Sequence, residues 1–388
     1  MHAAPLDAIS DDLMRPGLHG RRGGSPLPLL ALVHPFPREQ QWSVSLATAA
    51  LVPLVILGSY LAFGGPLPGK TPEEPAFLPA LEATPSVDST PVVIEQTWET
   101  QGEVDDPLDA PFGMTFAPDG TLWVADANKN RFQLFAPDGA FLETWGTSGS
   151  GDGEFNFLAS DHATKGTPGG YGDIAFAPDG TFYVADTGNF RIQQFGPDRA
   201  FIRAWGSEGT ADGQFINAMS VAIGPDGSVY VADENRDDVQ RFDADGQFLN
   251  SIGGVDAGED RLTYPVAVTV DPQGVVWVAN FSQPADIARF SPDGEPLGPW
   301  EHDTSQGTLR APLDVAIDPE GRVWVADMFR AQALVFAPDG SFVAKLRHAP
   351  TEARSGGFLN PAGVAVNDDG QAVVGDWFGD FITAFQVR

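Results

Sequence analysis

Two aspartates hold the same place in a pattern that repeats along this chain. Asp173 and Asp314 each stand directly before a short apolar segment, and the other repeats carry small residues there: Gly113, Ser220, Ala267 and Gly363. Two carboxylates beside a hydroxyl can bind a divalent cation or the basic group of a ligand. We therefore treat Asp173, Asp314 and Ser220 as a candidate site, with the two aspartates as candidate metal ligands. The alternative is that each carboxylate caps its strand or faces water.

A second candidate site consists of apolar residues that follow the polar end of a strand in the last three repeats. They are Phe281, Met328, Phe329, Trp377 and Phe378. Adjacent aromatic side chains exposed on a rigid surface are typical of a contact site for a partner or ligand. The alternative is that these rings fold inward over the sheet edges.

Histidines offer weaker support for a metal site. His162, His302 and His348 lie in polar connections, roughly ten or more residues before the next strand. Zinc ligands need fixed geometry and supporting hydrogen bonds, so solvated side chains are favoured. The chain has no cysteine, which excludes disulfides and thiolate chemistry. Its 22 basic and 53 acidic residues, a net charge of -31, argue against nucleic acid as a partner.

The elements that position these residues come from one pattern that occurs six times. An apolar strand leads to an Asp-Gly or related turn, and a second strand then ends in Val-Ala-Asp or a variant of it. The turn glycines are Gly120, Gly180, Gly227, Gly274, Gly321 and Gly370, spaced by 60, 47, 47, 47 and 49 residues. Such a period predicts an all-β fold, a six-bladed β-propeller, in which Asp173 and Asp314 belong to opposite blades at the channel mouth.

Further positions within each repeat are equally regular. The second strand carries an aromatic residue in five repeats and ends in a short polar residue in all six: Asp126, Asp186, Asp233, Asn280, Asp327 and Asp376. A side-chain oxygen at a strand end can accept backbone amides of the next turn, so we expect a structural role there. The third strand ends in phenylalanine, and the outer strand often closes on tryptophan, as at Trp145, Trp205 and Trp300.

The last repeat ends without an outer strand. The missing strand is found before the first repeat, at residues 92–98, where Trp98 aligns with Trp145 and Trp205. We expect this segment to complete the sixth blade, close the domain at residues 92–388 and remove two open sheet edges.

The N-terminal residues predict attachment to a membrane. Residues 1–41 are expected to form a disordered cytoplasmic tail, and residues 64–91 a proline-rich linker. Residues 42–63 contain no charged residue and are long enough for a single transmembrane helix. Arginines precede this span, which favours a cytoplasmic N-terminus and a propeller outside the cell membrane. A cleaved signal peptide is the alternative.

The segment from Asp179 to Ile192, with Asp186, Asn189 and Arg191, resembles the NHL repeat, as does the stretch Trp205-Gly206 to Phe215. The resemblance extends over about residues 92–388 and implies a six-bladed propeller. Proteins of this fold include protein- and RNA-binding scaffolds, amidating lyases, and the more distant streptogramin lyases and gluconolactonases. Fold alone does not choose among them.

We therefore expect a membrane-tethered binding or scaffold module for a protein, peptide or glycan. The alternative is a metal-dependent lyase or hydrolase acting on a small molecule at the channel mouth, with a divalent cation as its possible cofactor.

Overall fold

The computed structural model describes residues 92–158, 171–254, 257–258, 261–281, 286–305, 307–346 and 357–387. The expected tail, membrane span and linker, at 1–41, 42–63 and 64–91, lie outside these ranges. Within them, no helix is long and apolar enough to cross a membrane.

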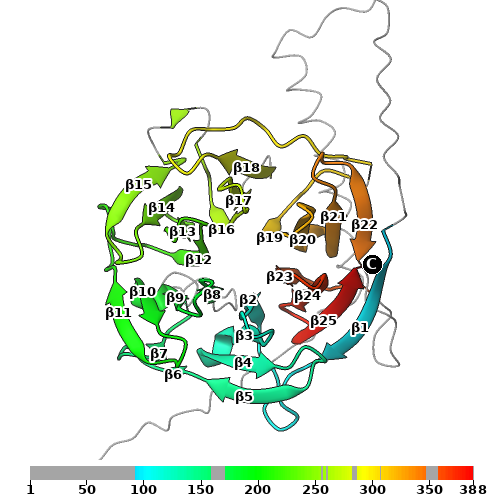
Figure 1. Cartoon of the computed structure of the whole chain (residues 1–388), viewed down its shortest axis with the longest axis horizontal. Helices are drawn as coiled ribbons and strands as arrows, with labels where there is room; N and C mark the ends of the chain where they lie inside the picture. Colours follow the sequence, from blue (N-terminus) through cyan, green and yellow to red (C-terminus); the bar gives the residue numbers. More distant parts are fainter. Residues whose placement is uncertain are drawn as a thin grey trace, which may run out of the picture. The chain divides into compact units, whose positions relative to one another are not determined.

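The described chain forms six antiparallel sheets arranged around a common axis (Figure 1). This all-β, six-bladed architecture confirms the predicted fold of the domain. The strand nearest the axis in each blade is β2 (Pro111–Phe116), β8 (Asp173–Phe176), β12 (Ala218–Ile223), β16 (Pro265–Val270), β19 (Pro312–Ile317) or β23 (Pro361–Val366).

The remaining strands follow outward in each blade. In blades 1 to 3 they are β3 (Leu122–Asp126), β4 (Arg131–Phe135) and β5 (Phe141–Trp145); β9 (Phe182–Asp186), β10 (Arg191–Phe195) and β11 (Phe201–Trp205); β13 (Val229–Asp233), β14 (Asp238–Phe242) and β15 (Phe248–Ile252). In blades 4 to 6 they are β17 (Val276–Asn280) and β18 (Asp286–Phe290); β20 (Val323–Asp327), β21 (Gln332–Phe336) and β22 (Phe342–Leu346); β24 (Gln371–Asp376), β25 (Phe381–Val387) and β1 (Ile94–Thr100).

The two ends of the domain meet in blade 6. Strand β1 pairs with β25, and its residues begin two positions after the expected start of the closing strand at residue 92. The Trp98 indole donates a hydrogen bond to the Pro137 carbonyl at 2.9 Å. A Cβ on Gly139 would lie 2.6 Å from the Trp98 ring, so the tryptophan packs directly on the blade 1 turn. Strand β1 therefore holds blade 6 against blade 1.

Blade 4 differs from the expected pattern because it has three strands, with no outer strand paired along β18. Pro296 and Pro299 fall in the segment that follows β18, and proline has no N–H to donate to a strand ladder. The segment pairs with β18 only at an isolated bridge between Phe290 and Pro296, where the Leu297 amide donates to the Arg289 carbonyl at 2.9 Å. Trp300 is nevertheless buried, so it still occupies the core position that Trp145 and Trp205 hold on their outer strands.

Aromatic side chains fill the spaces between blades. Trp145 on the outer strand of blade 1 lies 5.0 Å from the Phe195 ring of blade 2, edge to face. The phenylalanines that end the third strands are at most 2% exposed: Phe135, Phe195, Phe242, Phe290, Phe336 and Phe385. Burial of these rings is the main packing force between adjacent sheets.

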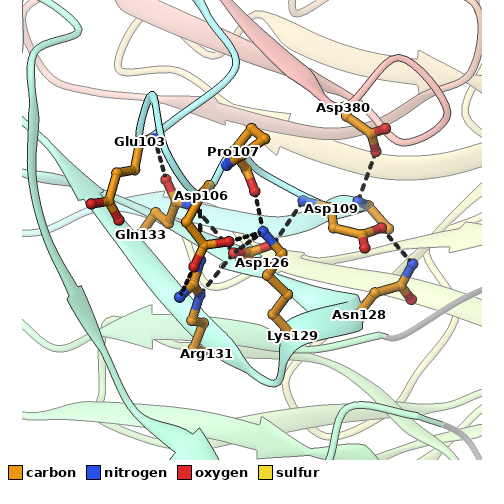
Figure 2. Close-up of polar contacts among 11 residues, drawn as sticks. Glu103, Asp106, Pro107, Asp109, Asp126, Asn128, Lys129, Arg131, Gln133 and Asp380 are labelled. Atoms are coloured by element: carbon orange, nitrogen blue, oxygen red, sulfur yellow. Dashed lines mark hydrogen bonds and ion pairs between the residues drawn. The ribbon is translucent and has the colours of Figure 1, made fainter.

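The strand-ending aspartates have the structural role expected for them. Asp126 accepts hydrogen bonds from the Asp109 amide at 2.7 Å, Arg131 Nε at 2.9 Å and Gln133 Nε2 at 3.1 Å (Figure 2). Asp186 of blade 2 accepts the equivalent set, from Asn156, Arg191 and Gln193. Each carboxylate thus ties the connection between blades to its own sheet. Asp380 of blade 6 contacts the segment that precedes β2, because its carboxylate accepts the Ala110 amide at 3.0 Å (Figure 2).

Candidate functional site

The candidate residues Asp173, Ser220 and Asp314 accept hydrogen bonds from backbone amides that line the axis. We call these three residues the channel acceptors. Asp173 accepts the Ile174 amide of its own strand at 2.9 Å, and from blade 3 the Val221 amide and the Ser220 hydroxyl, both at 2.9 Å. Ser220 in turn accepts the Val268 amide of blade 4 at 3.2 Å. These contacts join blades 2, 3 and 4 in sequence.

Asp314 repeats the arrangement on the opposite side of the ring. Its carboxylate accepts the Val315 amide of its own strand and the Val364 amide of blade 6, both at 2.8 Å. The three channel acceptors therefore receive five of the six equivalent inner-strand amides. Each aspartate thus caps its own strand, which was one of the alternatives to a ligand site, and each also reaches the next blade.

Close backbone approach explains why glycine occupies two of the equivalent positions. A Cβ on Gly113 would lie 2.2 Å from the Gly172 carbonyl oxygen and 2.5 Å from Asp173 Oδ1. A Cβ on Gly363 would lie 2.2 Å from the Phe112 carbonyl oxygen. Such distances are far inside van der Waals contact, so no other residue fits without movement of the backbone.

Burial raises the pKa of both aspartates. The pKa of Asp173 rises to about 6, mainly because its charged form loses hydration, and its hydrogen bonds offset part of this effect. Burial holds the pKa of Asp314 well above its usual range, and the negative charge of Asp173 raises it further. The two carboxylates thus repel one another across the axis.

The channel acceptors line a cavity of about 190 Å³ on the axis. A second cavity of about 380 Å³ shares five apolar lining residues with it: Phe176, Ile223, Val270, Ile317 and Val366. The second cavity also contacts Pro178, Pro225 and Pro319, which belong to the turns between inner and second strands. The channel therefore opens on the face of the domain that carries the Asp-Gly turns.

The opposite end of the channel is closed by apolar side chains, which we call the apolar plug. It comprises Phe112, Tyr171, Met219, Val266, Leu313, Ala362 and Trp377, all at most 8% exposed and all in one packed cluster. These residues come from all six blades, and side chains from six blades meet only near the axis. Phe112 lies 5.0 Å from Tyr171 and 6.3 Å from Trp377 between ring centres.

The two candidate sites are therefore separate. The sequence pattern placed Asp173 and Asp314 at the channel mouth. The structure puts the aspartates at the blind inner end of a channel that opens on the other face. One feature of the sequence could have indicated this, because a large apolar residue precedes the acceptor position in several repeats: Phe112, Met219, Val266 and Leu313.

The second candidate set, which we call the aromatic surface, consists of Phe281, Met328, Phe329, Trp377 and Phe378. Phe329 and Phe378 are 56% and 53% exposed, whereas Phe281 and Met328 are half-buried and Trp377 turns into the plug. Phe329 lies 5.6 Å from Phe281, edge to face. Phe378 stacks on Trp377 at 5.2 Å. Each exposed ring is thus supported by a ring beneath or beside it.

Backbone hydrogen bonds hold the turns of this surface in place. The Phe281 amide donates to the Tyr264 carbonyl, the Met328 amide to that of Ala311, and the Trp377 amide to that of Asn360. The three distances are 3.1, 2.9 and 3.0 Å. Because each acceptor lies in the connection that precedes the inner strand, the turns are fixed to the blade core at equivalent places.

His302 does not point toward the channel. Its ring stacks on Trp300 at 4.8 Å and lies 5.5 Å from Phe336, within the core between blades 4 and 5. His162 and His348 fall outside the described residues. Among the residues that are described, no three His, Cys, Asp or Glu side chains are grouped to hold a metal ion. A metal-dependent lyase or hydrolase stays a prediction.

Comparison with known proteins identifies the repeat. The NHL repeat family model matches residues 172–195, which run from the start of blade 2 to the end of β10. No curated protein gives a significant sequence match.

Solved structures share the fold at low sequence identity. A protein of unknown function from Bacteroides thetaiotaomicron has a TM-score of 0.54 at 14% identity, covering 76% of each chain. A gluconolactonase from Xanthomonas campestris has a TM-score of 0.53 at 14% identity, covering 72% of this chain and 88% of its own. A catalytically inactive virginiamycin B lyase from Staphylococcus aureus, solved with quinupristin, has a TM-score of 0.50 at 14% identity, covering 76% and 99%. At this identity the likeness concerns the fold alone, so the comparisons show a six-bladed β-propeller that carries an NHL repeat at residues 172–195.

Proposed function

We propose that this propeller is a binding module whose aromatic surface holds a protein or peptide partner. The single observation that carries the proposal is the pair of exposed rings, Phe329 and Phe378, each more than half exposed on a rigid turn. Aromatic side chains of this kind supply most of the binding energy at many protein interfaces, because they bury large apolar areas with few rotatable bonds.

The partner is expected to combine apolar and basic side chains. The chain carries a net charge of -31, so a cationic partner is attracted over a long range and an acidic one is repelled. Exposed aromatic faces also attract Lys and Arg side chains through cation–π contacts. A peptide with Arg or Lys next to an aliphatic or aromatic residue matches both features.

We further propose that residues 42–63 anchor the chain in the cell membrane and that the propeller faces outward, as the distribution of arginines favours. In that arrangement the proline-rich linker would hold the binding module away from the bilayer. Glycosylation-site tagging on either side of residues 42–63 would test the orientation.

Selection from a random peptide library on the purified full-length protein tests the binding proposal. We expect enrichment of peptides with Lys or Arg beside an apolar residue, and loss of at least tenfold in affinity in a Phe329→Ser/Phe378→Ser variant. A Leu142→Ser/Leu249→Ser variant is the matched control, since these side chains are 52% and 47% exposed on outer strands.

Two results would overturn the proposal. Either no peptide is enriched over an unrelated propeller, or the enriched peptides bind the aromatic-surface variant as tightly as the wild type. A glycan array run in parallel would show whether a carbohydrate binds in place of a peptide.

A further inference from the structure

The blind channel is separate from the aromatic surface, and its lining has the composition of a ligand-binding pocket. Its inner cavity of about 190 Å³ has polar groups at one end, and the wider cavity of about 380 Å³ leads to solvent. Pockets that bind small molecules are mostly apolar with a few convergent polar groups. Here the apolar walls come from Phe176, Ile223, Val270, Ile317 and Val366, which line both cavities.

The charged groups that face this channel are all acidic. Asp173 and Asp314 lie at the inner end, and Asp271, Asp318 and Asp368 line the wider cavity. Neither cavity is lined by a Lys, Arg or His of the described residues. Asp318 is paired with Arg322, so its charge is compensated. The low-dielectric walls concentrate the field of the other carboxylates along the axis, which favours a cation over a neutral or anionic molecule.

The channel acceptors keep hydrogen-bonding capacity beyond their bonds to the inner strands. An ionised carboxylate offers about four acceptor positions, and a hydroxyl oxygen about two. Asp173 accepts three hydrogen bonds, Asp314 two and Ser220 one. Acceptors therefore remain on both sides of the axis at the place where a ligand entering the channel must stop. The plug beyond them prevents further passage.

We propose that this blind end binds the ammonium group of a small primary amine, whose apolar body lies against the five shared apolar residues. An ammonium group has three N–H donors and no acceptor, which suits a space bounded by Asp173, Ser220 and Asp314. The amine neutralises part of the repulsion between the two carboxylates and places its hydrocarbon portion in the apolar section. The site goes beyond the proposed partner binding, since the plug separates it from the aromatic surface.

Proton release should accompany binding. Burial raises the pKa of both channel aspartates, and the charge of Asp173 raises that of Asp314 further, so both hold a proton more tightly than an exposed carboxyl group does. A bound cation favours the ionised carboxylates and lowers their pKa, which expels protons. No other titratable side chain of the described residues lines the inner cavity. A purely structural role for the aspartates would produce no such release.

Titration calorimetry on the full-length protein tests the proposal with 2-phenylethylamine as the probe. Its neutral analogue 2-phenylethanol and its anionic analogue 3-phenylpropionate serve as ligand controls. We expect binding of the amine alone, with an apparent heat that depends on the ionisation enthalpy of the buffer. Equal binding of the alcohol, or no binding of the amine at millimolar concentration, would overturn the proposal, as would a heat that is the same in all buffers.

Two variants locate the site. Ile317→Trp narrows the junction of the two cavities without touching the acceptors, and Asp314→Asn removes one charge. Each variant should bind the amine at least tenfold more weakly than the wild type does. The exposed control Asp152→Asn should bind it with unchanged affinity. Unchanged affinity in Ile317→Trp, with the fold retained by circular dichroism, would place the amine elsewhere and refute the assignment. The Phe329→Ser/Phe378→Ser variant should bind the amine normally, so failure of one proposal is distinct from failure of the other.

Discussion

The Asp173 carboxylate accepts the Ser220 hydroxyl at 2.9 Å, and this contact joins two blades whose residues are 47 positions apart in the chain. The Ser220 oxygen in turn accepts the Val268 amide of the next blade. Without this pair, the inner-strand amides would point into the channel without a partner. With it, their hydrogen bonds link three consecutive sheets. The equivalent link from Asp314 to Val364 spans 50 positions.

Removal of the Asp173 carboxylate should destabilise the domain. Asp173→Ala leaves the amides of Ile174 and Val221 without their acceptor, and buried unsatisfied amides cost about 1–3 kcal/mol each. Water in the channel can replace part of this loss, so we expect about 2–3 kcal/mol by chemical denaturation. The exposed control Asp152→Ala should change the free energy of unfolding by less than about 0.5 kcal/mol. Equal stability of the two variants would contradict the linking role.

Stability should fall as the pH rises through the pKa of Asp173. The folded-state pKa is about 6 against the usual 3.8, so the folded protein holds this proton more tightly than the unfolded chain. The resulting stabilisation is complete below the unfolded value and is lost as the pH approaches and passes about 6. Asp314, whose pKa burial and the charge of Asp173 also raise, adds a loss of the same sign.

Melting temperatures between about pH 4 and pH 7 measure this effect. The net charge of -31 acts in the same direction, so the wild type alone does not isolate the aspartate. Asp173→Asn removes the titrating carboxyl group and leaves most of the net negative charge of the protein in place. The melting temperature of this variant should vary less with pH than that of the wild type. A variant slope equal to that of the wild type would show that Asp173 does not carry the dependence.

The closing strand should be essential to the whole domain. Deletion of residues 92–98 removes most of β1, including its pairing with β25 and the Trp98 contact with the Pro137 carbonyl. Strand β25 then becomes an open sheet edge, and blade 6 loses the part of its contact with blade 1 that Trp98 provides. We expect a cooperative melting transition at clearly lower temperature, or none at all.

A point variant tests the same closure with less disruption. Trp98→Ala should cost about 2 kcal/mol, below the range for a fully buried tryptophan because this side chain is half-buried. Val104, which is 94% exposed, provides the control Val104→Ala. If deletion of 92–98 leaves the melting temperature unchanged, β1 does not close the propeller.

Alanine substitutions at two turn glycines can distinguish the energetic cost of backbone strain from the cost of a clash with a neighbouring side chain. Gly246 and Gly227 have nearly equal φ, +80° and +82°, so alanine should cost about 1 kcal/mol of strain at each. At Gly246 the new Cβ also lies 2.7 Å from the Trp205 ring, whereas at Gly227 nothing lies within 4 Å. Gly246→Ala should therefore be more destabilising than Gly227→Ala by at least about 1 kcal/mol, measured by urea denaturation. Equal costs would mean that the ring moves away without penalty.

The sequence was sufficient for the architecture of the domain. The spacing of the turn glycines predicted six blades, and the alternation of apolar residues placed the strands. Both signals are local, because the positive φ of a turn glycine such as Gly246 and the alternation of apolar residues along a strand are set within a few residues. The closing strand was also predicted to within two residues, since Trp98 repeats the outer-strand pattern of Trp145 and Trp205.

The arrangement of the candidate sites was decided only by the tertiary structure. Nothing local indicates that Trp377 turns into the plug, and only the apolar residues that precede the acceptor positions point to a blind end beside Asp173 and Asp314. Each of these facts depends on side chains from different blades that meet at the axis, some 50 residues apart in the chain. The missing outer strand of blade 4 is an intermediate case, because Pro296 and Pro299 are visible in the sequence. Hydrogen bonding and close packing across blades depend on distances that no single repeat encodes, so they appear only when the ring is complete.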